Sequence, residues 1–284
     1  MPELPEVHTT VKGLKKFIIG KTIKSVWSDF HIGAKYNNKE NIKNESYLKK
    51  FKELVEGTRI KSAERIGKNI LIHLNNKHSI IIHMKMTGNL VYDKEVKFVH
   101  LKFTLSNNKK LILSDMRKFA SITISPTIEL QNHERISKLG VDALDPKLTS
   151  KKFFECLYNK RGPIKSVLMD QESIAGLGNI YTDEILWESG VHPLSHPDKI
   201  PETKYKEIFK VMKKILHFSI KQGGDSKSDY RNIFGEKGNF QNFHKVYGRK
   251  SKKCPKRGCS GIIKRQTIGG RSAHFCPKHQ IMYK

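Results

Sequence analysis

The spacing of apolar residues changes near residue 125, and this change divides the chain into two parts of different secondary structure. Between residues 22 and 124, short β-branched runs such as 70–74 and 99–105 are separated by Asn-Asn or Asn-Lys turns, a pattern typical of antiparallel strands. Beyond Pro126 the apolar residues recur at helical spacing, and Gly223 ends the longest such stretch. We therefore expect a multi-domain α+β protein in which an antiparallel β-sandwich or barrel precedes a helical domain.

A further helix is predicted ahead of the strands, over residues 2–19. Apolar residues recur through it at steps of four and three, namely Val7, Val11, Leu14 and Ile18. This helix would bring the N-terminus of the chain to one edge of the β-domain. In the second part, helices are expected over 150–158, 164–171, 180–188 and 201–222, and the polar segment 225–245 is expected to form a mobile loop.

The net charge indicates a polyanionic partner. The 284 residues include 54 Lys and Arg against 27 Asp and Glu, a formal net charge of +27, which is far more than solubility requires. An anionic membrane surface is the alternative, but the chain has no long apolar run, and its amphipathic stripes are broad enough for a core. No secretion signal or lipid anchor is recognised. These features favour an intracellular protein that binds nucleic acid.

Three of the four cysteines lie near the C-terminus and suggest a metal site. Four residues separate Cys254 from Cys259, and two separate Cys276 from His279. Two such pairs suit tetrahedral zinc, and the residues between them can form a β-hairpin. His274 is the competing nitrogen ligand, and a coincidence of cysteines in a basic tail is the alternative. We expect one structural zinc ion, bound by Cys254, Cys259, Cys276 and His279.

The first residues of the chain offer a nucleophile beside an acid. Removal of Met1 exposes the secondary amine of Pro2, and Glu3 follows it. An α-amino group titrates near ~7.7 to 8.0, so part of it is unprotonated at neutral pH, and such an amine can form a Schiff base. The alternative is purely structural, since proline suits the first turn of a helix and Glu3 and Glu6 complement the helix dipole.

Six segments, taken in order, resemble one protein family. They are PELPEV at 2–7, HMKMTG at 83–88, SDMRKF at 114–119, DQESIAGLGNIYTDEILWESGVHP at 170–193, VYGRK at 246–250 and the cysteine-rich finger. In these segments the chain resembles the formamidopyrimidine-DNA glycosylases of the endonuclease VIII superfamily, and the resemblance extends from Pro2 to the finger. It implies a helix-two-turn-helix fold for the helical domain and a zinc-finger β-hairpin.

The resemblance also implies an activity and its catalytic residues. Enzymes of this family excise oxidised bases and then nick the DNA strand at the abasic site. By resemblance, the Pro2 amine attacks C1′ and Glu3 is the general acid, which gives a covalent iminium that undergoes β,δ-elimination. Lys68 matches a hairpin lysine that contacts a phosphate and assists proton transfer. Arg271 matches an arginine that grips the lesion phosphate during the second elimination.

Further residues match DNA contacts of the family. Met86 corresponds to a residue that fills the hole left by the flipped base, and Arg117 and Phe119 to a pair that faces the orphaned base and wedges the stack. Plain core packing is the alternative for Met86 and Phe119. The candidate contacts to phosphates in the helical domain are Lys160, Lys165 and Asn179, and a purely structural helical hairpin is the alternative there.

Four features depart from the family pattern. Lys85 and Ala120 stand where glycine is usual, and Phe98 stands where a DNA-contacting histidine is frequent. The fourth is the finger, with four residues in its first knuckle and His279 in its last. None of these departures affects Pro2, Glu3 or Lys68. The PELPEV opening and the long segment between Gly224 and Val246 favour oxidised purines over oxidised pyrimidines as substrates.

We therefore expect a monomeric bifunctional DNA glycosylase and abasic-site lyase of base excision repair, with the lesion bound between its domains. The expected parts are a catalytic β-sandwich domain over 1–125, a linker over 126–145, a helix-two-turn-helix domain over 146–245 and a zinc finger over 246–284. Two other classes stay open. One is a catalytically silent zinc-finger protein that binds damaged DNA, and the other is a zinc-ribbon accessory factor of transcription or replication.

Overall fold

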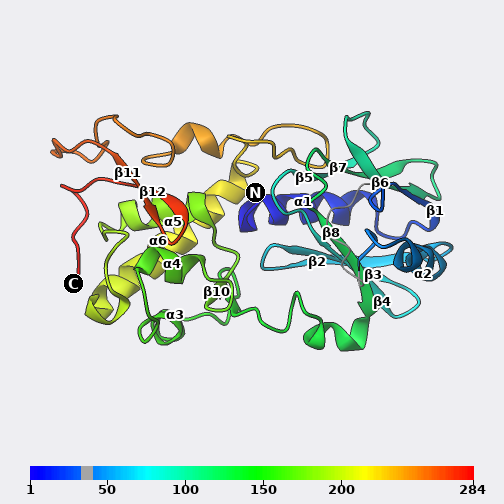
Figure 1. Ribbon diagram of the computed structural model, residues 1–284, viewed down its shortest axis with the longest axis horizontal. Helices are drawn as coiled ribbons and strands as arrows, with labels where there is room; N and C mark the ends of the chain where they lie inside the picture. The colour runs from blue at the N-terminus through cyan, green and yellow to red at the C-terminus, as the bar shows by residue number, and fades with distance from the viewer. Residues whose placement is uncertain (33–40) are drawn as a thin grey trace. The chain divides into compact units, whose positions relative to one another are not determined.

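Two four-stranded antiparallel sheets form the first part of the chain, as predicted (Figure 1). The structure is a computed structural model that describes residues 1–32 and 41–284. One sheet has the order β1-β6-β7-β5 and the other β2-β3-β4-β8. The strands are β1 (Ile23–Ser28), β2 (Ile60–Ile66), β3 (Asn69–Leu74), β4 (His78–His83), β5 (Gly88–Tyr92), β6 (Val99–Leu105), β7 (Lys110–Asp115) and β8 (Ser121–Pro126). Buried apolar side chains from both sheets share one core, as in a β-sandwich.

Helix α1 (Leu4–Phe17) packs against β2 and β3 and adds its apolar stripe to this core. Val7, Val11 and Leu14 are buried, as their spacing predicted. The helix is shorter than the predicted 2–19 because Glu3 is its N-cap and Ile18 its C-cap. Pro2 and Glu3 therefore lie at the beginning of a helix that is fixed to the sandwich.

A second helix, α2 (Glu45–Val55), lies inside the stretch that was predicted to be β throughout, so that prediction is wrong here. Its buried residues Leu48, Phe51 and Val55 follow one another at steps of three and four. The side chain of Asn44 caps the helix by accepting a hydrogen bond of 3.1 Å from the backbone N–H of Tyr47. Both signals are present in the sequence, but the helix is short and lies between strands.

The chain forms two compact units, one of Met1–Ser137 with Gln222–Asn239 and one of Lys138–Lys221 with Phe240–Lys284. In the first unit, the segment that was expected to be mobile is fixed by hydrogen bonds to residues distant in the chain. The hydroxyl of Tyr230 donates to the carbonyl of Glu6 (3.0 Å), and the side chain of Asn89 accepts from the N–H of Arg231 (2.9 Å). A polar sequence does not reveal such long-range partners. The finer division into catalytic domain, linker, helical domain and finger stays a proposal.

The second unit contains the predicted helices. They are α3 (Ser150–Leu157), α4 (Ile164–Met169), α5 (Asn179–Glu188) and α6 (Glu202–Lys221), with the short strands β9 (Val141–Asp142) and β10 (Ile174–Ala175) paired in parallel. Three short 3₁₀ helices complete the described chain: η1 (Thr127–Asn132) in the first unit, and η2 (Pro197–Lys199) and η3 (Phe240–Phe243) in the second. Among the residues described, no helix is long and apolar enough to cross a bilayer.

A β-hairpin of β11 (Lys264–Ile268) and β12 (Arg271–Phe275) lies near the C-terminus, as predicted for the finger. Two consecutive acidic residues of α5 fix this region. Asp183 accepts a hydrogen bond of 2.9 Å from the N–H of His274, and the Glu184 carboxylate accepts from three successive N–H groups of residues 245–247. Burial raises the pKa of Glu184, and the three backbone hydrogen bonds oppose that shift.

A buried ion pair lies inside the second unit. The ammonium of Lys165 contacts the Asp183 carboxylate, and both side chains are almost completely buried, at 0% and 1% exposed. The other carboxylate oxygen of Asp183 contacts Nδ1 of His274 at 3.0 Å. Removal of one partner from such a pair leaves an uncompensated charge in the interior.

We predict that Asp183→Asn lowers the free energy of unfolding by about 3 kcal/mol or more, because Lys165 loses the carboxylate that stabilises its buried charge. The measurement is urea denaturation followed by circular dichroism. Glu188→Gln, on the same helix, is the matched control. Its ion pair with Lys214 (3.3 Å) is exposed, so its loss changes stability by less than about 1 kcal/mol. Equal effects of the two substitutions would contradict the prediction.

Candidate active site and metal centre

Pro2 and Glu3 are both buried, and a capping box fixes Glu3, the residue next to Pro2, at the beginning of α1. The N–H of Glu3 donates to Oε2 of Glu6 (2.7 Å), and the Glu3 carboxylate in turn accepts from the helix backbone at Glu6. The second oxygen of Glu6, Oε1, accepts from the N–H of Asp225 (2.7 Å). The Glu6 carboxylate therefore links the first residues of the chain to the segment 222–239 of the same unit.

Lys68 lies in the turn between β2 and β3, and its side chain is 8% exposed. The turn is tight, because Gly67 adopts a φ of +57°. Both strands pack against α1, and in Figure 1 the beginning of α1 and this turn lie toward the same end of the first unit. The beginning of α1, which follows Pro2 and Glu3, and the turn that carries Lys68 thus lie toward the same end of the sandwich.

A histidine that was given no role, His83, lies in a strongly cationic part of the first unit. Burial, together with the nearby charges of Lys85, Arg135 and Lys68, lowers the pKa of His83 to about 3. The ring is therefore neutral at physiological pH. His83 lies in one of the matching segments, whereas no sequence signal placed Arg135 here.

The structure brings together the three residues that were expected to wedge the DNA stack. Nη1 of Arg117 lies 3.4 Å from Sδ of Met86, and the Arg117 guanidinium lies 4.4 Å from the centre of the Phe119 ring. Met86 and Phe119 are each 39% exposed, so they are not core residues. Large apolar side chains that project from a surface beside an arginine are suited to insertion between bases.

The candidate phosphate contacts of the second unit fall into two groups. Lys160 and Arg271 are exposed, and Asn179 lies close to the hairpin, since its Nδ2 donates to Oγ of Ser272 at 3.3 Å. Asn179 is the first residue of α5, and Gly178 occupies the N-cap position. Lys165 is completely buried against Asp183, so the expectation that it contacts a phosphate directly does not fit the structure. The helical spacing alone did not reveal its buried partner.

The hairpin turn that carries Arg271 approaches α4 closely. Gly269 has a φ of +55°, and a Cβ atom there would lie 2.5 Å from Oγ of Ser166. Only glycine fits this approach without displacement of its neighbour. Together with the bonds of Asn179 to Ser272 and of Asp183 to His274, this contact fixes β12 against α4 and α5.

Three cysteines form a cluster that can hold a metal ion. The sulfurs of Cys254, Cys259 and Cys276 lie within 4.8 Å of one another, and none is in a disulfide. Gly261 is required beside them, because a Cβ there would lie 2.4 Å from the sulfur of Cys276. The backbone N–H of Gly261 lowers the pKa of Cys259, whereas burial raises that of Cys276 to about 11. Three thiols at this separation suit a soft metal ion.

The two histidines that competed for the fourth ligand position have different surroundings. Nδ1 of His274 contacts Asp183, so this ring is directed to the buried ion pair. Nε2 of His279 lies 2.8 Å from the carbonyl oxygen of Trp187. His279 does not belong to the cluster that the three cysteine sulfurs form. However, a carbonyl oxygen at this distance accepts a hydrogen bond from a protonated Nε2. In a neutral imidazole, Nδ1 is then the nitrogen that keeps a lone pair for a metal ion.

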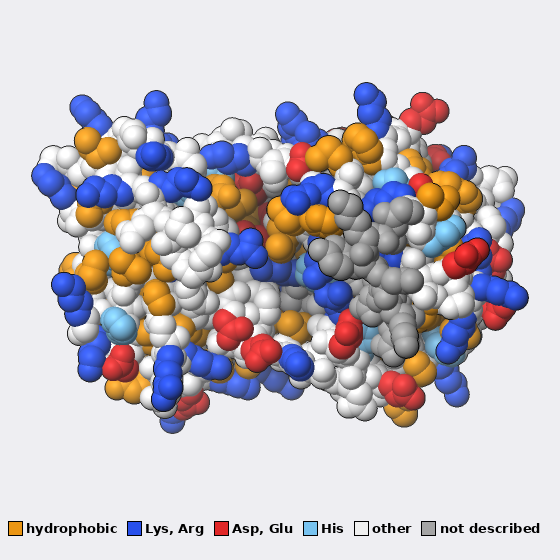
Figure 2. Space-filling view, in the orientation of Figure 1, with side chains coloured by type: hydrophobic (Ala, Val, Ile, Leu, Met, Phe, Trp, Pro, Cys, Tyr) orange, Lys and Arg blue, Asp and Glu red, His pale blue; other side chains and the backbone are white. Residues whose placement is uncertain are grey.

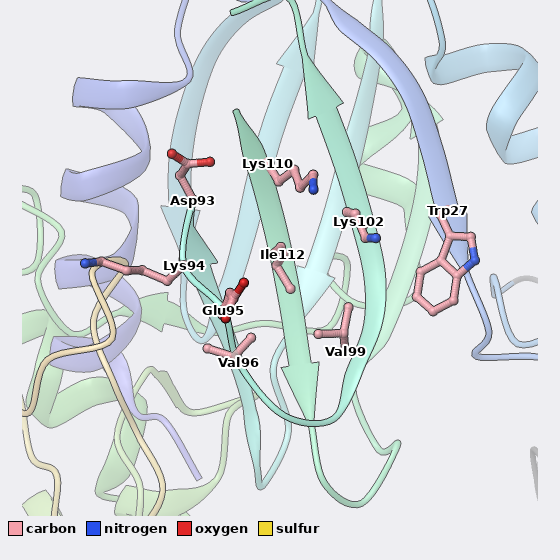
Figure 3. A pocket seen from close by; sticks show the side chains of 9 residues that line it. All are labelled: Trp27, Asp93, Lys94, Glu95, Val96, Val99, Lys102, Lys110 and Ile112. Atoms are coloured by element: carbon pink, nitrogen blue, oxygen red, sulfur yellow. The ribbon is translucent and has the colours of Figure 1, made fainter. Parts of the chain in front are cut away.

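A separate open hollow of about 580 Å³ lies in the first unit (Figure 3). Strand residues Trp27, Lys102, Lys110 and Ile112 line it together with the loop that follows β5. Its lining carries both lysines and acidic residues, and none of the predicted site residues is among them. We therefore do not place the reaction there.

Comparison with known proteins matches the whole chain to one family. The model of the formamidopyrimidine-DNA glycosylase N-terminal domain matches residues 1–122, and that of the H2TH domain matches residues 139–231. A formamidopyrimidine-DNA glycosylase of Oceanobacillus iheyensis is 37% identical over 99% of this chain and 98% of its own length. That of a Streptococcus pneumoniae strain is 34% identical over 99% of both.

Solved structures agree with these matches. The complex of Lactococcus lactis Fpg with DNA that contains an abasic site has a TM-score of 0.87 and 29% identity, and the match covers 98% of this chain and 99% of that one. MutM (Fpg) of Thermus thermophilus has a TM-score of 0.85 and 29% identity, with 98% of each chain covered. These similarities confirm the predicted fold class. They show that the chain belongs to the formamidopyrimidine-DNA glycosylase family.

Proposed function

We propose that this protein is a bifunctional DNA glycosylase and abasic-site lyase of base excision repair, acting inside the cell on DNA that contains oxidised bases or abasic sites. The observation that carries the proposal is the capping box that fixes Glu3, and so the residue next to Pro2, at the beginning of α1, in a chain whose relatives are named for glycosylase activity. Lys and Arg side chains are also spread over the face of both units shown in Figure 2, which suits a polyanion. A catalytically silent DNA-binding protein is the alternative.

The first step is attack of the unprotonated Pro2 nitrogen on C1′ of the damaged nucleotide. The bond from C1′ to the base breaks, and the base leaves with the electron pair of that bond. Glu3 donates a proton to the departing base or to the opening sugar oxygen. The nitrogen then loses its own proton, and the C1′–O4′ bond breaks as the sugar ring opens, so that O4′ keeps the electron pair of that bond and takes up a proton. The nitrogen and C1′ now share the double bond of a charged iminium.

The second phase is strand cleavage by elimination. The iminium acidifies the C2′ proton, and its removal expels the 3′ phosphate oxygen. Loss of a second proton then expels the 5′ phosphate. We assign Lys68 to proton transfer and phosphate contact, and Arg271 to the phosphate of the lesion. The cations around His83 support these roles, because they favour an anion beside Lys68.

The wedge formed by Met86, Arg117 and Phe119 is proposed to occupy the space that the flipped nucleotide leaves. Lys160 and Asn179 are proposed to contact the DNA backbone, and Lys165 to support Asn179 and β12 from inside the unit. We propose oxidised purines as the favoured substrates. A formamidopyrimidine is a ring-opened purine, and one related structure contains Fapy-dG in its DNA, although another contains an oxidised pyrimidine.

We propose that Cys254, Cys259, Cys276 and Nδ1 of His279 hold one structural zinc ion. The cysteine cluster and the carbonyl on Nε2 of His279 support this ligand set. The ion would keep the finger folded and so hold Arg271 in position. It has no part in the elimination chemistry, which needs neither a metal nor a water nucleophile.

Activity is predicted to require a free Pro2 amine. A variant with an uncleaved residue ahead of Pro2, and the variant Glu3→Gln, should each lose at least about 100-fold in base excision, the usual size of a lost acid–base contribution. Binding to an abasic-site analogue should change by less than threefold, because the phosphate contacts are unchanged. Excision assays and fluorescence anisotropy measure the two properties. Full excision by the extended variant would rule out the amine mechanism.

Metal analysis is predicted to find one zinc per chain. Cys259→Ser should lose it, His279→Gln should bind it less tightly, and His279→Cys should retain it, because thiolate can replace imidazole in a tetrahedral site. Zinc content after dialysis against a chelator is the measurement, and Cys156→Ser, outside the cluster, is the control. Unchanged retention of zinc by His279→Gln would remove His279 from the ligand set.

A further inference from the structure

One end of the sheet β2-β3-β4-β8 gathers an excess of cations. Asn69, His83 and Ser121 lie side by side there, since Asn69 pairs with His83 across β3 and β4, and His83 pairs with Ser121 across β4 and β8. Lys68 directly precedes Asn69 in the chain. The side chain of Asn69 also donates to the carbonyl of Arg135 at 3.4 Å.

Two more lysines reach this end through hydrogen bonds. The N–H of Lys85 donates to Nδ1 of His83 at 3.0 Å. The side chain of Asn41 donates to Oγ of Ser121 at 2.8 Å, and Lys43 lies two residues further along the chain. Strand register and these bonds thus bring Lys43, Lys85 and Arg135 to the same edge as Lys68.

The acidic side chains near these cations do not balance their positive charge. Burial lowers the pKa of both Lys43 and Lys85, and Arg135 lowers both further. The opposing acids are Asp115, which acts on Lys43, and Glu134, which acts on Lys85 and lies 3.8 Å from Arg135. Within residues 1–32 and 41–284, neither Lys43 nor Lys85 forms an ion pair through its Nζ. An anion bound here would relieve the mutual repulsion.

Lys85 is also held in an unfavourable backbone conformation. Its φ is +53°, in the left-handed region that favours glycine. A strained residue persists where the surrounding structure holds it, and such residues are frequent at functional sites. The next residue, Met86, contacts Arg117. Lys85 thus places a charge in the cation cluster immediately beside the wedge.

We propose that Lys43, Lys85 and Arg135 form an additional phosphate-binding site, which takes a backbone phosphate of the DNA next to the base step that Met86 opens. The site lies at the same edge of the sheet as Lys68, and it would hold a second phosphate in addition to the lesion phosphate assigned to Lys68 and Arg271. The inference rests on the proposed DNA-binding function and adds to it a named subsite. Lys85 then serves as a DNA contact. The favourable free energy of that contact would offset the cost of its strained backbone when DNA is bound.

The test compares Lys85→Gly with Lys77→Gly. Lys77 also has a positive φ, +63°, and it lies exposed in the turn between β3 and β4, away from the cluster. Both substitutions remove one charge and relieve the same kind of strain. We expect both variants to keep the wild-type melting temperature or exceed it. Only Lys85→Gly should weaken binding to an abasic-analogue duplex, by about 5- to 10-fold at low salt.

The salt dependence identifies the lost contact as a phosphate. Affinity decreases with salt, so the slope of log affinity against log salt concentration is negative. Its magnitude should decrease by about 0.9 for Lys85→Gly and stay unchanged for Lys77→Gly. Lys43→Ala and Arg135→Ala should each lower it in the same way. Lys85→Asn provides a second variant, because asparagine tolerates a positive φ.

Wild-type affinity and slope in both Lys85→Gly and Lys85→Asn would overturn this inference while leaving the proposed glycosylase function intact. Equal losses in Lys85→Gly and Lys77→Gly would also overturn it, since the effect would then come from net charge alone. Failure of the wild-type protein to bind the duplex would be a different result, because it would remove the DNA-binding function itself.

Discussion

The carboxylate of Glu6 connects the parts of the first unit on which the proposed chemistry depends. One oxygen accepts the N–H of Glu3, and the other accepts the N–H of Asp225, each at 2.7 Å. The carbonyl of Glu6 also accepts the hydroxyl of Tyr230. A terminal amine is ordinarily among the least ordered groups of a protein. Here a buried carboxylate fixes the residue beside it, so the amine can be held in one place without being consumed in a structural hydrogen bond.

The second unit uses two neighbouring carboxylates in a comparable way. Asp183 and Glu184 are consecutive on α5, and each fixes a different part of the finger through backbone N–H groups. Lys165 neutralises Asp183 inside the unit. The hairpin that carries Arg271 is therefore fixed by buried polar contacts as well as by any bound metal. Such contacts are sensitive to removal of one partner, since the remaining group stays buried.

The sequence was most informative where structure follows from local pattern. The stripe of Val7, Val11 and Leu14 predicted α1, and the short β-branched runs predicted the sandwich. What local pattern could not supply were partners distant in the chain. The burial of Lys165 depends on Asp183, and the anchoring of the segment around Tyr230 depends on Glu6 and Asn89. The cation cluster around His83 arises from strand register, which brings Lys43, Lys85 and Arg135 together from three separate segments.

The central claim is that the Pro2 nitrogen becomes covalently attached to DNA, and borohydride trapping tests it most directly. Protein with Met1 removed is incubated with an abasic-site oligonucleotide and sodium borohydride, and the adduct is digested and mapped by mass spectrometry. The account predicts a reduced sugar linked to the N-terminal peptide at Pro2. An adduct on a lysine such as Lys68, or no adduct at all, would contradict it.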